Sequence, residues 1–117
     1  MTLRDIYDHV YNTLLPTAYD GIPNDFDFKN GIAIDVKIGE SIINKHDLDD
    51  ITLQIRIVGL LERKMAIVEQ GEQIDGLVNN HCFSPCYIVR EDPYLVTYED
   101  GDKFNVVLQY IIKNFKY

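Results

Sequence analysis

A chain of 117 residues, 46% hydrophobic and 26% charged, suits one globular domain that buries a core without disulfide or metal staples. Its net charge of −8 at pH 7 argues against a broad nucleic-acid-binding surface, because the phosphate backbone would repel it. No apolar run approaches the roughly 20 residues that span a bilayer, and the chain does not start with a secretory pattern. We therefore expect no membrane contact and a cytosolic setting.

The first predicted element is an amphipathic helix over residues 3–14. Thr2 and Asp5 have the spacing of an N-terminal capping box. Apolar side chains then recur at steps of three and four residues, at Leu3, Ile6, Val10 and Leu14. Pro16 ends the helix, and the turn-forming residues of segment 15–30 predict an ordered loop.

Two strands with one buried face are predicted over residues 32–38 and 51–57. Apolar and polar side chains alternate through both segments with a period of two. A slip of one residue would bury Asp35 or Arg56 and expose four branched apolar side chains. Each of those side chains contributes about 1.5–3 kcal/mol when buried. The pattern therefore specifies the register of each strand.

The connection between these strands, residues 39–50, is too long for a tight hairpin turn. It is polar near its end but also carries Ile42, Ile43 and Leu48. Two interpretations stay open at this point. The segment is either a projecting arm or an acidic loop that folds back on its own domain.

A second helix is predicted from Leu61 to about Asn79, followed by strands over residues 86–90, 94–98 and 103–113. The order is α-β-β-α-β-β-β in a single domain spanning residues 1–117. The simplest arrangement for this α+β chain is a mainly antiparallel or mixed five-stranded sheet with both helices packed on one face.

The last predicted strand has a second face that is half apolar. Its side chains are Asn105, Val107, Gln109 and Ile111. A small domain on its own seldom leaves such a strand face exposed. We expect it to be covered by a helix or by another subunit, so these four residues are candidate intersubunit contacts.

No catalytic, metal or cofactor site is predicted. His81, Cys82 and Cys86 are the strongest metal candidates, but no second pair of ligands follows, and His9 and His46 lie far upstream. Reduced structural cysteines are the simpler interpretation. The chain also lacks a glycine-rich phosphate loop, a G-x-S-x-G elbow and an EF-hand spacing. We therefore do not expect an enzyme.

The chain resembles the tail-terminator (minor capsid) proteins of long-tailed bacteriophages. The resemblance is carried by a strand that ends just before a helix and by the segments that follow it, namely Leu53-Gln54-Ile55-Arg56-Ile57-Val58-Gly59, Ser84-Pro85, Tyr87-Ile88-Val89-Arg90-Glu91-Asp92 and the strand over residues 104–112. It covers about residues 3–113. The stretch with Cys82 and Cys86 and the short 39–50 connection depart from the family pattern.

The resemblance implies a homo-oligomeric ring, a hexamer, that caps the tail tube, ends tube growth and offers the head-tail connector a docking surface. Its partners would be the major tail tube protein and the connector protein, in the virion neck and, during assembly, the host cytoplasm. DNA would pass through the lumen without specific binding. Gln54 and Arg56 become candidate intersubunit contacts, and segment 39–50, with Ile42 and Ile43, a candidate arm toward neighbouring rings.

Two alternatives to a tail-terminator subunit remain. The first is another head-tail joining or tube adaptor subunit, which would bind a different neighbour. The second is a monomeric α+β binding domain, which would bind one partner and not assemble.

Overall fold

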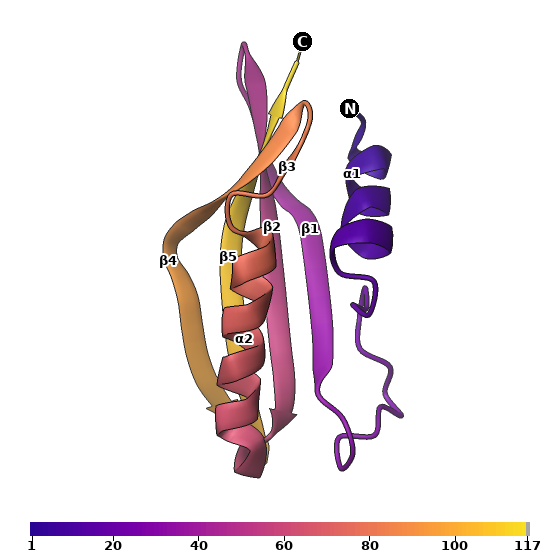
Figure 1. Cartoon of the computed structure of the whole chain (residues 1–117), viewed down its shortest axis with the longest axis vertical. Helices are drawn as coiled ribbons and strands as arrows, with labels where there is room; N and C mark the ends of the chain where they lie inside the picture. The colour runs from indigo at the N-terminus through magenta and orange to yellow at the C-terminus, as the bar shows by residue number, and fades with distance from the viewer. Residues whose placement is uncertain (117) are drawn as a thin grey trace.

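A computed structural model describes residues 1–116 as a curled, five-stranded antiparallel sheet with two helices on one face (Figure 1). The strand order is β1-β2-β5-β4-β3. The elements are α1 (Leu3–His9), β1 (Ala33–Asn44), β2 (Leu48–Leu60), α2 (Lys64–Val78), β3 (Cys82–Phe83), β4 (Cys86–Asp100) and β5 (Lys103–Phe115). The predicted α+β class and element order are confirmed.

The core lies between the helices and the inner face of the sheet. Alternate strand residues such as Ile55 and Leu108 are fully buried there against Ile6 of α1 and Ile67 of α2. Gly71 lets α2 approach β5 closely, since a Cβ at this position would lie 3.1 Å from Val106 Cγ1. The apolar alternation seen in the sequence thus becomes one continuous core.

The N-terminal helix follows the predicted pattern. Thr2 and Asp5 form both hydrogen bonds of the capping box. The last turn, Val10–Leu14, widens into a π-helix, with the Leu15 amide donating to the Val10 carbonyl at 2.8 Å. Helical structure therefore covers residues 3–14, as expected.

The hairpin between β1 and β2 differs from the prediction for residues 39–50. After an irregularity between Ile38 and Ile42, the two strands resume pairing, and Asn44 lies opposite Asp49. The turn itself is only residues 45–47, closed by the Lys45 amide donating to the Leu48 carbonyl. Figure 1 shows the tip of this hairpin beyond both helices. The expected long connection is thus mostly strand.

The C-terminal strands also differ in detail. The predicted strands 86–90 and 94–98 are one strand, β4, which is interrupted by an irregularity between Arg90 and Leu95. The short strand β3, which pairs with the start of β4, was not predicted. Within residues 1–116, no helix is long and apolar enough to cross a membrane.

Candidate functional site: the outer face of the sheet and the β1–β2 arm

The sheet face that lies away from the helices, here called the outer face, has an apolar half on β4 and β5. Val89 lies opposite Ile111 and Val96 opposite Val107. Tyr87 and Phe115 stack at one end, with ring centroids 6.2 Å apart. We define the apolar patch as Tyr87, Val89, Val96, Val107, Ile111 and Phe115. All six side chains are exposed or half-buried, so the patch is open to a partner.

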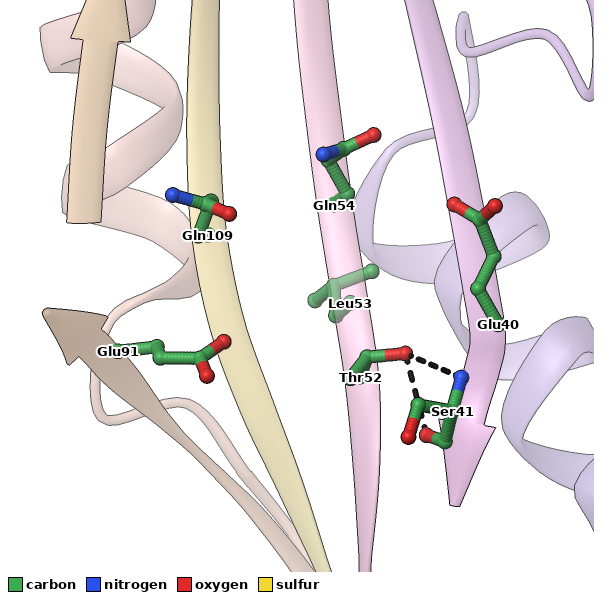
Figure 2. A pocket seen from close by; sticks show the side chains of 7 residues that line it. All are labelled: Glu40, Ser41, Thr52, Leu53, Gln54, Glu91 and Gln109. Carbon is green, nitrogen blue, oxygen red and sulfur yellow. Dashed lines mark hydrogen bonds between the residues drawn. The ribbon is translucent and has the colours of Figure 1, made fainter. Parts of the chain in front are cut away.

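The other half of the outer face is polar. Figure 2 shows a shallow hollow on this side of the sheet, with the helices behind the strands. It is lined by Glu40, Ser41, Thr52, Leu53, Gln54, Glu91 and Gln109. The Thr52 hydroxyl donates to the Ser41 carbonyl and accepts from the Ser41 amide, and Gln109 Nε2 donates to the Pro93 carbonyl at 2.9 Å. The polar side chains that line the hollow are two amides, two hydroxyls and two carboxylates.

The end of the outer face near the β4–β5 turn is covered by the chain itself. Ile22 and Phe28 of the loop before β1 line a hollow together with Arg56 and Asn105. Lys103 lies over the Phe28 ring, 4.8 Å from its centroid. Asn105 is only 1% exposed and accepts a hydrogen bond from Arg56. Its burial removes Asn105 from the candidate intersubunit contacts.

The arm, defined as residues 39–50, presents apolar side chains at the opposite end of the sheet. Ile42 is 46% exposed and Ile43 is 57% exposed. Because they are neighbours on a strand, they point to opposite faces of the hairpin. Both therefore stay available to a partner that approaches the arm from either side.

Ion pairs fix the base of the arm. Asp50 accepts from Lys45 Nζ at 2.8 Å and from Lys113 Nζ at 3.0 Å. Burial favours the neutral acid, but the hydrogen bonds and charges of the two lysines outweigh it and lower the pKa of Asp50. Lys116 Nζ lies 3.3 Å from Asp49 on the same hairpin. The arm is thus tied to β5 by charge as well as by strand pairing.

The residues singled out from the sequence fall in three places. Gln54, Val107, Gln109 and Ile111 lie together on the open part of the outer face. Arg56 lies at the covered end, with its guanidinium 3.6 Å from Asp35. The isoleucines of the arm are separate from both groups. The candidate contacts therefore form two surfaces, the outer face and the arm.

The metal candidates do not come together. Both cysteines are free thiols, Cys82 exposed and Cys86 buried. Burial raises the pKa of the Cys86 thiol, whose Sγ lies 3.2 Å from Asn114 Oδ1. Across the described residues, no three His, Cys, Asp or Glu side chains gather as a metal site.

Two polar clusters were missed from the sequence. His9 contacts His81 across 72 positions, with 2.8 Å between their Nε2 atoms. Asp75 on α2 is buried and accepts from the Tyr110 hydroxyl at 2.6 Å and from the Arg90 guanidinium. A local sequence pattern cannot predict contacts between residues this far apart in the chain, because only the fold brings them together.

No family model, curated protein or solved structure in the comparisons matches this chain. The functional argument therefore depends on the geometry of the outer face and the arm. Of these two surfaces, the apolar patch points most directly to a partner, because a contiguous apolar surface is seldom left in water.

Proposed function

We propose that this chain is a self-assembling structural subunit that binds further copies of itself through the apolar patch and the arm. The observation that supports this most is the exposure of the patch. The loop before β1 reaches Asn105 but leaves Val107 and Ile111 half-open, and Val96 is 39% exposed. Burying one such side chain contributes about 1.5–3 kcal/mol, so joint burial of the patch would support a stable interface.

The positions of the two surfaces favour a ring over a simple dimer. A two-fold dimer joins one patch to itself, whereas a ring joins two different surfaces head to tail. The apolar patch lies on β4 and β5, and the exposed isoleucines lie at the end of β1, just before the turn of the β1–β2 hairpin. One subunit therefore offers two separate apolar surfaces, as head-to-tail closure needs.

The biological role that we propose is the one implied by the sequence resemblance. A ring of these subunits would cap a phage tail tube and present a docking surface to the head-tail connector. The net charge of −8 suits a ring whose lumen passes DNA without binding it. The same charge opposes association of copies, so assembly should be stronger at higher ionic strength.

The test is the mass of the assembled protein together with its action on tubes. Light scattering over a range of concentrations, and electron microscopy with purified tail tubes, should reveal rings or capped tubes. Ile111→Lys places a charge in the patch and should abolish both. Gln73→Lys adds the same charge on the exposed face of α2 and should leave both intact.

Three outcomes would contradict parts of the proposal. A protein that stays monomeric under all conditions and caps no tube would be a monomeric binding domain. Rings that bind connector proteins but not tubes would indicate a different head-tail joining subunit. Rings that are equally stable in Ile111→Lys and in the wild type would show that the patch is not the interface.

A further inference from the structure

The His9–His81 pair joins the N-terminal helix to the segment after α2. The two Nε2 atoms are 2.8 Å apart, and the ring centroids are 5.1 Å apart with planes inclined by 21°. These values describe two nearly coplanar rings that meet head to head. Phe83 of β3 packs flat against His9, with centroids 4.0 Å apart, so the contact is partly shielded from solvent.

Head-to-head geometry suits a shared proton. One imidazole must donate from Nε2 and the other must accept, so the bond forms in the neutral pair and in the singly protonated pair. A second proton removes the acceptor and sets two positive charges against each other. A single metal ion would instead need the two lone pairs to converge at an angle.

The helix that this pair holds covers an edge of the sheet. β1 is an edge strand. The Tyr7 hydroxyl donates to the Ile38 carbonyl at 2.9 Å, and the Tyr11 hydroxyl donates to the Val36 carbonyl at 2.7 Å. Edge carbonyls that are satisfied in this way cannot accept a strand from another chain. Release of the helix would therefore expose both core side chains and strand edge.

Charged and titratable groups also lie on the elements that carry or adjoin the pair. On the N-terminal helix, α2, β3 and the start of β4, these groups are the Met1 amine, Arg4, Asp5, Tyr7, Asp8, Tyr11, Lys64, Glu69, Glu72, Asp75, Cys82, Cys86, Tyr87 and Arg90. The Asp5 carboxylate caps the Thr2 amide, and Asp75 is held by Arg90 and Tyr110. Burial, followed by the charge of His81, lowers the pKa of His9.

We propose that His9 and His81 form a proton-operated clasp, which strengthens the closure of α1 over the β1 edge at neutral pH and weakens it when both imidazoles are protonated. The direction of the pH effect follows from the linkage between proton binding and opening. The open state binds the second proton near the ordinary histidine pKa of about 6.5, and the closed state binds it only at lower pH. The closed state is therefore fully favoured above about pH 6.5 and loses stability as the pH falls below that value.

The test is hydrogen exchange of the full-length protein at pH 7.5 and at pH 5.5, corrected for the intrinsic pH dependence of exchange. Because the closed pair excludes the second proton, the opening constant of the α1 amides should rise about five- to tenfold between the two pH values. The α2 amides should not change. His81→Gln keeps a hydrogen-bonding side chain that does not titrate, and should remove the pH response.

The chain supplies a matched control. It has three histidines, and the third, His46 at the arm tip, has a side chain that is 99% exposed. His46→Gln should keep the full response. An α1 opening constant that is equal at both pH values, or a response that persists in His81→Gln, would overturn the clasp. Saturable Zn²⁺ binding that protects α1 in the wild type but not in His81→Gln would overturn it in favour of a metal site.

Discussion

Replacing Tyr110 by Phe should test the buried polar contact between α2 and β5. The Tyr110 ring is fully buried, and its hydroxyl donates to Asp75 Oδ1 at 2.6 Å. A hydrogen bond to a charged group contributes about 1.5–3 kcal/mol. Arg90 Nε still donates to the same oxygen at 3.2 Å, so we expect the lower part of that range, about 1.5–2 kcal/mol. At about 4 °C per kcal/mol for a domain of this size, Tm should fall by roughly 6–8 °C.

The pH dependence gives this prediction a second readout. Burial is the largest influence on Asp75 and favours the neutral acid, but the hydrogen bonds from Arg90 and Tyr110 outweigh it and lower its pKa. A lowered carboxyl pKa contributes stability that is complete above the unfolded value of about 3.9 and is lost as the pH falls through the folded value. The difference between the wild type and Tyr110→Phe should therefore be full at pH 7 and shrink below about pH 4.

Urea denaturation at a series of pH values measures both quantities. The control is Tyr98→Phe, since Tyr98 is 41% exposed on β4 and loses the same hydroxyl at the surface. The reasoning is refuted if Tyr110→Phe costs no more than Tyr98→Phe. It is also refuted if the free-energy difference stays constant from pH 7 to pH 3.

Three further predictions concern helix packing and the sheet edge. Gly71→Ala should destabilise the protein by about 1–3 kcal/mol, because the new Cβ lies 3.1 Å from Val106 Cγ1. Gly76→Ala on the same helix meets no atom within 4 Å and should stabilise it by about 0.4–1 kcal/mol in the same denaturation assay. Tyr11→Phe leaves the Val36 carbonyl without its side-chain donor and should cost about 1 kcal/mol, with faster exchange of the α1 amides.

The regular parts of the fold could be predicted from the sequence because the patterns that specify them are local. The alternation around Asp35 and Arg56 predicted which face of β1 and β2 lies in the core, and both residues do lie on the outer face, opposite each other. Asp35 was expected to stay unburied but is only 5% exposed, and it accepts from the Gly21 amide of the loop before β1. The capping box at Thr2 likewise marked the start of α1. The strand alternation reflects the buried face of the sheet, and the capping box reflects local hydrogen bonds at the helix end.

The features that the sequence did not predict depend on long-range contacts or on irregular structure. The irregularity after Ile38 breaks the alternation, so the continuation of β1 to Asn44 could not be read from the pattern. Pro93 resembled a strand boundary but lies within β4. Asn105 was expected to contact a helix or another subunit, because nothing in its own segment predicts that the loop before β1 lies beside it. Such placements follow from tertiary contacts alone.

The pairing of β2 with β5 has a mechanical consequence. These strands are paired at 13 positions, which corresponds to roughly 44 Å of ladder in a molecule 46 Å long. A pull on the arm tip that is resisted at the far end would act along the strand axes. The hydrogen bonds between the strands would then share the load in shear and would not open one after another. A subunit built in this way resists a pulling force along its long axis.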